Sequence, residues 1–477
     1  MNQKKKSTGS SSAVIDREIA YATTLLTLLA ASGVTPYESF KRLRNEKLLP
    51  AIRKEANAIV RQVEVLGADP LSAMSKSAER TRSKPLRDLL AGYVSTVNSG
   101  GSVVSFLRSR TRSAFELQAA VAKNATEKLG AMVEAYMIML VVAFTVYIMT
   151  IAMPVSAVSS FNAPPMTLYL LVFFGLLIVM LLLMSLTHTI WRGTMLDIGQ
   201  LYKGAIVPAA AGGAIGGALY FLQPLIGFTK PDVPWLPVVM GVSLLVMSIK
   251  PLLDYQRLSK VVSNAESEMP SFLRDVAEAR KTGLSPEKCI VHAARRKRTG
   301  QFSEYLKIVA NQLEWGVALR NVLRSIQQKV RSWPVLVNFL ILAETIEAGG
   351  GHYSSLEILA ESAEKSRTIE ADRRNLLKPY LFVPFLIIAA LSFTTIGMVQ
   401  SLVDISAGGL NPGEMQALIE VFAAGTVVNA WLTGFFTGKV VDGSFAAGFK
   451  YSALLVTTAL SAILAATVMP LDVLGVI

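Results

Sequence analysis

Polar and apolar positions divide the chain into four long blocks. In the two polar blocks, residues 1–130 and 254–379, apolar side chains recur at helical spacing, with little two-residue alternation. The two apolar blocks, residues 131–253 and 380–477, contain long runs of hydrophobic residues. This pattern predicts an all-α, polytopic membrane protein in which each polar block is a helical-bundle domain and each apolar block is a set of membrane spans.

Seven apolar runs are long enough to cross a bilayer, which takes roughly 20 mainly apolar residues. They lie at about 131–153, 166–188, 204–222, 234–253, 380–402, 415–437 and 451–471. We therefore expect about seven transmembrane helices, four after the first polar block and three after the second.

The two polar blocks are similar to each other. Three segments match in the same order: Ser32–Ser39 with Thr282–Cys289, Gly67–Ala78 with Gly316–Gln327, and Asn98–Leu107 with Ala348–Glu357. Subtracting their first residue numbers gives offsets of 250, 249 and 250. Self-similarity at one period is the signature of a structural repeat, so we expect two copies of one helical domain.

Glycine and proline mark the helix ends inside each copy. Thr35-Pro36 and Ser285-Pro286 each supply a hydroxyl cap followed by proline in the first helical turn. Before the last helix of each copy stands a glycine turn, made of Gly100 and Gly101 in the first and of Gly349, Gly350 and Gly351 in the second. Glycine suits tight turns between helices, and a hinge is the alternative role for these positions.

The apolar stretch from Ile19 to Ser32 has two interpretations. It follows a cationic N-terminus, as a signal anchor would. However, Thr23, Thr24 and Thr27 interrupt it, and the equivalent stretch Met269–Gly283 is an amphipathic, charged helix. The repeat therefore favours a domain helix at Ile19 to Ser32.

The excess of positive charge lies in the two polar blocks. Residues 1–130 hold 21 Lys and Arg against 11 Asp and Glu, and residues 254–379 hold 20 against 15, whereas the apolar blocks hold 4 against 3 and 2 against 5. Because positive segments stay on the cytoplasmic side, we expect both polar domains and the N-terminus in the cytoplasm and the C-terminus outside.

Candidate chemistry is scarce. No nucleotide-binding, nucleophile-elbow or zinc-protease motif occurs, and the string Gly434–Val440 has the wrong spacing for a phosphate loop. Cys289 is the single cysteine, and the three histidines lack ligand spacing. We therefore expect no metal, no cofactor and no catalytic residue, which points to a non-enzymatic scaffold.

The third span contains two overlapping pairs of glycines four residues apart, Gly212 with Gly216 and Gly213 with Gly217. Such pairs let helix backbones approach closely, within the protein or between two copies, although a glycine-rich span without a special partner is equally compatible.

Glu134 and Glu420 lie near predicted span ends, which favours interfacial placement over an ion relay.

The SG(V/L)(T/S)P string, the mid-domain glycine, the GG turn and the following membrane block resemble the cytoplasmic domain of the type II secretion system F family. These are the platform proteins of type IV pili, type II secretion and archaella. The resemblance covers both polar blocks. Four spans between the domains and three after them are similar to the archaeal members, whereas the apolar, Thr-rich first helix departs from the family pattern.

The resemblance implies partners and a docking surface. The implied partners are a hexameric secretion ATPase, pilin or archaellin subunits and the lipid bilayer, with a homodimer compatible and no nucleic acid expected. Two basic clusters at similar repeat positions are the candidate ATPase contacts: Lys41, Arg42, Arg44 and Lys47 in the first copy, and Arg295, Arg296, Lys297 and Arg298 in the second. Attraction to anionic lipid is the alternative role of these clusters. The alternatives for the whole chain are a secretion platform without a stable fibre and a membrane transporter with regulatory domains.

Overall fold

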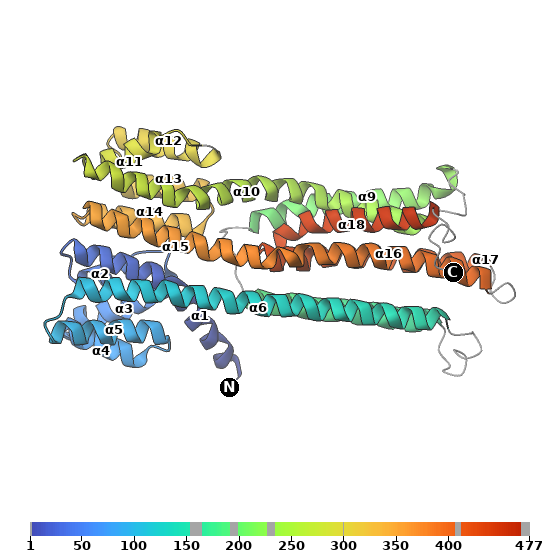
Figure 1. The fold of residues 1–477 in the computed structure, drawn as a ribbon, viewed down its shortest axis with the longest axis horizontal. Coiled ribbons are helices and arrows are strands. Elements are labelled where there is room, and N and C mark those ends of the chain that lie inside the picture. The colour runs from blue at the N-terminus through green and yellow to red at the C-terminus, as the bar shows by residue number, and fades with distance from the viewer. Residues whose placement is uncertain are drawn as a thin grey trace. The chain divides into compact units, whose positions relative to one another are not determined.

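The computed structural model describes residues 2–152, 165–190, 199–226, 234–298, 300–405 and 412–468. The described residues are helical and contain no β-strand, which confirms the predicted all-α class. The helices of the first half are α1 (Asn2–Ala31), α2 (Pro36–Leu43), α3 (Pro50–Glu64), α4 (Pro70–Arg80), α5 (Lys84–Asn98), α6 (Val103–Ala152), α8 (Pro165–Ile190) and α9 (Gly199–Ile226). Those of the second half are α10 (Trp235–Lys281), α11 (Pro286–Arg295), α12 (Gln301–Glu314), α13 (Leu319–Lys329), α14 (Trp333–Glu347), α15 (Tyr353–Leu377), α16 (Pro379–Ile405), α17 (Pro412–Val441) and α18 (Phe445–Val468) (Figure 1).

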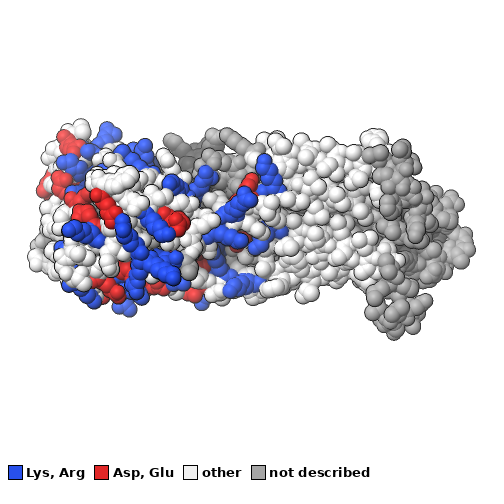
Figure 2. Space-filling model, turned by 90° about the horizontal axis from the view of Figure 1, so that it is seen from above, with Lys and Arg blue, Asp and Glu red and all other residues white. Residues whose placement is uncertain are grey.

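The described helices form two compact units. Of the described residues, unit 1 contains 2–123, 258–298 and 300–372, and unit 2 contains 124–152, 165–190, 199–226, 234–257, 373–405 and 412–468. Charged side chains gather on unit 1, whereas the visible surface of unit 2 is mostly uncharged (Figure 2). The polar repeats therefore share one unit. Whether residues 1–130, 131–253, 254–379 and 380–477 are four separate domains stays a prediction.

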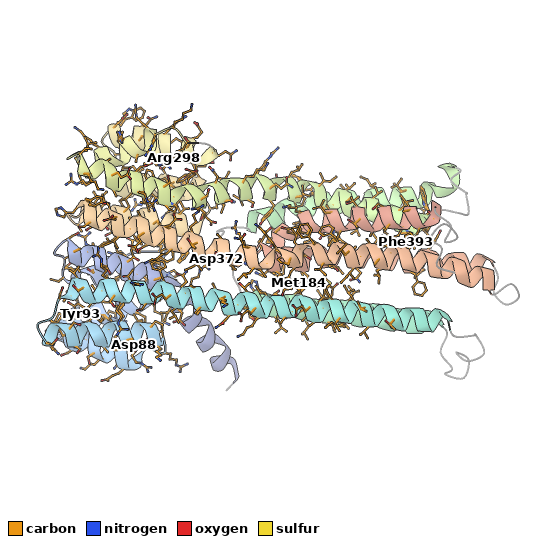
Figure 3. The ribbon with its side chains drawn as sticks, in the orientation of Figure 1. Asp88, Tyr93, Met184, Arg298, Asp372 and Phe393 are labelled. Atoms are coloured by element: carbon orange, nitrogen blue, oxygen red, sulfur yellow. The ribbon has the colours of Figure 1, made fainter. Side chains whose placement is uncertain are left out.

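Both polar repeats contribute to a single hydrophobic core in unit 1, which includes Tyr93 of α5 (Figure 3). The central contact is between α1 and α14, one helix from each repeat. Helix α14 is buried on every side, as expected for a helix that is apolar all round. Trp333 at its start donates from Nε1 to the carbonyl of Leu48 at 2.8 Å and packs edge-on against Tyr21 of α1. The repeats thus form one body with a common interior.

The Thr-rich character of α1 follows from this central position. Its leucines, such as Leu25 and Leu28, are fully buried, and its threonine hydroxyls face other helices of unit 1. Thr27 Oγ1 lies 2.9 Å from Thr111 Oγ1 of α6, and Thr24 Oγ1 donates to Ser362 Oγ of α15 at 3.5 Å. These contacts support a domain helix, rather than an inserted anchor, at Ile19 to Ser32.

The backbone repeats as well as the sequence. Among the described residues of unit 1, positive φ angles occur at three pairs of glycines, one member per repeat: Gly33 and Gly283, Gly67 and Gly316, Gly100 and Gly349. The third of the three sequence matches is off by one residue at the glycine turn only, because α6 and α15 begin at Val103 and Tyr353, which keep the predicted offset of 250. The amide of Gly101 donates to the carbonyl of Thr96 and that of Gly350 to the carbonyl of Thr345, both at 2.9 Å, so the local offset is 249.

Unit 2 is built mainly from apolar helices. Helices α16, α17 and α18 pack on one another around a core of buried aliphatic residues, with Phe393 of α16 against it (Figure 3). A second cluster joins α6, α8 and α17, where the Tyr136 hydroxyl lies 2.6 Å from Thr433 Oγ1. Burying polar groups with partners in this way keeps their desolvation inexpensive.

Five helical stretches in the described part are long and apolar enough to cross a membrane: Gly204–Phe221, Trp235–Lys281, Tyr353–Phe393, Glu420–Val441 and Phe445–Thr467. They overlap five of the seven predicted windows. The other two, 131–153 and 166–188, lie on α6 and α8, whose apolar side chains are only partly described. The membrane character is supported, and the count of seven stays a prediction.

Candidate functional site

The first basic cluster lies on α2 and the loop that follows it. Thr35 Oγ1 accepts a hydrogen bond from the amide of Glu38 at 3.4 Å, and Pro36 occupies the first turn, so the Thr-Pro pair begins the helix as predicted. Lys41 forms an ion pair with Glu38 at 3.5 Å, and Lys47 is exposed. This part of the cluster is a solvated surface.

Two arginines of the clusters make equivalent ion pairs in the two repeats. Arg44 caps the end of α2 and pairs at 2.7 Å with Glu64, the last residue of α3. Arg295 ends α11 and pairs at 2.5 Å with Glu314, the last residue of α12. The duplication therefore extends to a side-chain contact between two successive helices.

Arg42 has a different environment from its neighbours because it reaches the other repeat. Its Nη1 lies 3.1 Å from Oε2 of Glu344 on α14, whose side chain is 1% exposed. Arg320 at the start of α13 pairs with the same carboxylate and lies 3.3 Å from Glu347. Burial and the nearby Glu344 carboxylate raise the pKa of Glu46. Two arginines, one from each repeat, thus neutralise a buried carboxylate.

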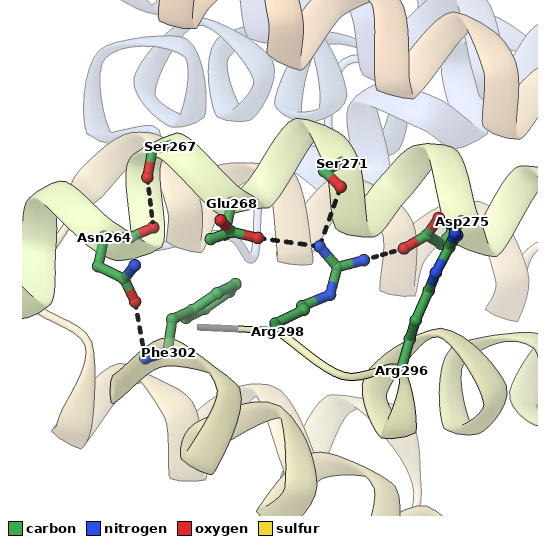
Figure 4. Close-up of polar contacts among 8 residues, drawn as sticks. All are labelled: Asn264, Ser267, Glu268, Ser271, Asp275, Arg296, Arg298 and Phe302. Carbon is green, nitrogen blue, oxygen red and sulfur yellow. Dashed lines mark hydrogen bonds and ion pairs between the residues drawn. The ribbon is translucent and has the colours of Figure 1, made fainter. Parts of the chain in front are cut away.

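The side chain of Arg298, in the second cluster, is buried. Its side chain is 5% exposed and lies on α10, where it pairs with Glu268 at 3.1 Å, with Asp275, and with the hydroxyl of Ser271 at 3.0 Å (Figures 3 and 4). Arg296 pairs with the same Asp275. The chain after α11 is therefore fastened to α10 by two arginines.

These contacts divide the eight predicted docking residues. Arg42 and Arg298 hold unit 1 together, so their charge is used inside the protein. The remaining six lie at or near the surface, and their contact with an ATPase stays a prediction: Lys41, Arg44, Lys47, Arg295, Arg296 and Lys297. Sequence patterns could not point to Glu344, because its partner Arg42 lies 302 residues away along the chain.

The glycine turns are sites of close approach. Gly100 and Gly349 have φ angles of +67° and +79°, which only glycine adopts at low cost. A Cβ on Gly350 would collide with the hydroxyl of Ser32 in the other repeat and lie 2.6 Å from the carbonyl of Thr345, and one on Gly101 would lie 3.1 Å from a methyl of Thr96. Glycine is thus required in these turns, both by the backbone conformation and by the lack of space for a Cβ atom.

The third glycine of the second turn lies close to the Ser-Pro turn of the same repeat. Gly351 has a φ of +93°, and a Cβ there would lie 3.1 Å from Pro286 of the Ser-Pro turn. Its carbonyl accepts a hydrogen bond from Nε of Arg280 at 2.8 Å. The turn before α15 is therefore bound to the start of α11, which gives the predicted conformational role a structural basis.

A family model named "Type II secretion system (T2SS), protein F" matches this chain twice, over residues 21–151 and 272–399. The two matched segments together cover more than half of the chain, and each begins in the opening helix of a repeat. The chain belongs to the type II secretion system protein F family. Each matched segment is an F domain followed by apolar helix. Proteins of this family are structural membrane proteins that generally interact with a secretion ATPase.

Among known proteins, the F-family chain is similar to an uncharacterized protein of Methanocaldococcus jannaschii. The two are 22% identical over 478 residues, which is 92% of this chain and 78% of that protein. No solved structure matches.

The glycine pairs of the predicted third span fall on different faces of α9. A Cβ on Gly212 would lie 2.6 Å from the carbonyl of Ser243 on α10, and one on Gly216 would lie 3.0 Å from the Ser243 side chain, whereas Gly213 and Gly217 have open space. The Ser243 hydroxyl donates to the carbonyl of Gly212 at 2.7 Å. One glycine pair therefore forms a helix crossing within the F-family protein.

The sequence interpretation missed a second close crossing, between α17 and α18. Cβ atoms on Gly434 and Gly438 would collide with the backbones of Ser452 and Gly448. The signal was a GxxxG pair inside the string that had been weighed only as a phosphate loop. In this protein the string brings two apolar helices together.

The side chains that could be chemically reactive are buried or make structural contacts. Cys289 is fully buried, and burial raises the pKa of its thiol, which disfavours the reactive thiolate. Glu134 is exposed and accepts a hydrogen bond from the Tyr380 hydroxyl at 2.9 Å. Within the described ranges, no group of three His, Cys, Asp or Glu residues could hold a metal ion.

Proposed function

We propose that this F-family protein is the membrane platform of an archaeal type IV pilus or archaellum. It couples a separate cytoplasmic hexameric ATPase to the extraction of pilin or archaellin subunits from the bilayer and to their assembly into a filament. In this role both repeats and the N-terminus face the cytoplasm, the C-terminus lies outside, and ATP hydrolysis takes place in the partner.

The observation that carries the proposal is that two F domains share one hydrophobic core, and that apolar helices follow each of the two domains. A motor partner that acts on unit 1 would meet one body, because the repeats share a hydrophobic interior and the Arg42–Glu344 ion pair. The similarity to an archaeal protein over 92% of the chain favours the archaeal branch.

Binding of the ATPase tests the docking part of this function. We expect the full chain in nanodiscs to bind a purified hexameric secretion ATPase from the same organism, guided by complementary charge. Lys47→Glu and Lys297→Glu should weaken binding and slow association, whereas Lys76→Glu, the same change on exposed α4, should not. If all three variants bind like the wild type, the basic clusters are not the docking surface.

The transporter alternative predicts a different result. Vesicles that contain only this chain would then take up a small solute with saturation in the absence of any ATPase. We expect no such uptake.

A further inference from the structure

The most exposed large apolar side chains among the described residues of unit 1 occupy two equivalent turns. Leu66 and Val65 are 74% and 70% exposed and precede Gly67, while Trp315 is 85% exposed and precedes Gly316. We call Val65 and Leu66 the first apolar tip and Trp315 the second apolar tip. Single exposed apolar residues are ordinary, but the same position in both copies of a repeat is not explained by chance scatter.

The surroundings of the tips are duplicated too. In each repeat the residue before the tip is the glutamate that ends a helix, Glu64 of α3 or Glu314 of α12. Each glutamate pairs with an arginine from the end of the preceding helix, at 2.7 Å for Arg44 and 2.5 Å for Arg295. After each tip a glycine with positive φ turns the chain into the next helix. Both tips are therefore held on rigid helix ends.

A backbone hydrogen bond closes each of the two turns, although the first turn is one residue longer than the second. The amide of Ala68 donates to the carbonyl of Gln62 at 3.1 Å, and the amide of Val317 donates to the carbonyl of Gln312 at 3.0 Å. These bonds close the last turn of each helix and leave the tip on the outside. Little backbone entropy would be lost when such a turn is covered by a partner.

We propose that the two tips are paired anchors that insert into equivalent apolar pockets on a partner made of identical protein subunits. An apolar side chain with a polar border is the arrangement of a binding hot spot. Because each bordering arginine is already paired with a glutamate, the border is balanced in charge. A lipid surface would instead select an excess of cations. Two equivalent anchors require two equivalent pockets, which identical subunits of a ring provide. This inference rests on the proposed function, in which that ring is the ATPase.

The test compares Leu66→Ser, Trp315→Ser and the double variant with Val121→Ser, an exposed apolar residue of α6 at an unrelated position. The full chain in nanodiscs is titrated with the hexameric ATPase. Each single variant should weaken binding about 30-fold or more, since a hot-spot anchor is lost together with two-point attachment. The double variant should show no measurable binding, and Val121→Ser should bind like the wild type.

The alternatives give distinct results. Wild-type affinity in both single variants and in the double variant would overturn the inference while leaving the proposed ATPase contact intact. Loss of binding to anionic vesicles, or loss of self-association, with unchanged ATPase affinity would also overturn it. If the wild type itself does not bind the ATPase, the proposed partner and this inference both fail. Unchanged thermal unfolding of the variants shows that they fold, and a shift of Trp315 fluorescence on binding in the Leu66→Ser protein provides a second measurement.

Discussion

The buried carboxylate of Glu344 makes a sharp prediction about two arginines that are two residues apart in sequence. Arg42 and Arg44 are both on or next to α2 and both form ion pairs, but their partners differ in burial. Glu344 is 1% exposed and belongs to the other repeat, whereas Glu64 is 38% exposed and belongs to the same repeat. Arg42→Met should therefore destabilise unit 1 much more than Arg44→Met.

The magnitude follows from the solvent exposure of the partners. Removing one arginine from a fully buried pair costs roughly 3 to 5 kcal/mol. Arg42 is itself 31% exposed, and Glu344 keeps Arg320, so we expect about 2 kcal/mol. For a domain of this size, that lowers the unfolding temperature by roughly 4 to 8 °C. The pair of Arg44 is near the surface and contributes less than about 1 kcal/mol.

The assay is thermal unfolding in detergent, followed by tryptophan fluorescence, to which Trp333 in the core of unit 1 contributes. A double-mutant cycle with Arg42→Met and Glu344→Gln isolates the pair, with an expected coupling of about 1 to 3 kcal/mol. Equal shifts for the Arg42 and Arg44 variants, or a coupling near zero, would refute the conclusion that this ion pair joins the repeats.

Three further predictions concern close approach and protonation. Gly350→Ala should lower the unfolding temperature, because its Cβ would collide with Ser32 of the other repeat. Gly438→Ala should disrupt the α17–α18 crossing and lower detergent stability by about 1 to 3 kcal/mol, whereas Gly213→Ala, with open space around it, should be neutral. Burial raises the pKa of Glu18 from 4.5 to about 7, so between these pH values the folded state holds a proton that the unfolded state has lost. The free energy of unfolding should therefore fall as pH rises from about 4.5 to 7. Glu18→Gln should remove this part of the pH profile in unfolding scans.

Much of the fold could be predicted from local sequence patterns. Helical periodicity gave the all-α class, and glycine and proline gave most helix ends, because these residues act through their own backbone angles. The duplication was predicted correctly, but its third match is off by one residue at the glycine turn, because the second copy has one glycine more there than the first. Only the hydrogen bonds of Gly101 and Gly350 decide the register.

The sequence could not reveal contacts between distant segments. Arg42 and Arg298 looked like their basic neighbours, and only the structure shows that Arg298 is buried against α10 and that Arg42 pairs with a buried carboxylate of α14. The common core of the repeats was also missed, although the Thr-rich α1 gave a signal: a helix that is apolar all round belongs in the centre of a domain. The apolar tips were overlooked because exposure, rather than composition, distinguishes Leu66 and Trp315.

The central claim is that this F-family protein is the platform on which a filament is assembled. The most direct test is electron microscopy of cells that lack its gene, with a strain complemented by the wild type as control. The account predicts that filaments disappear in the deletion strain, that processed subunits accumulate in the membrane, and that complementation restores the filaments. Filaments of normal number and length in the deletion strain would contradict it.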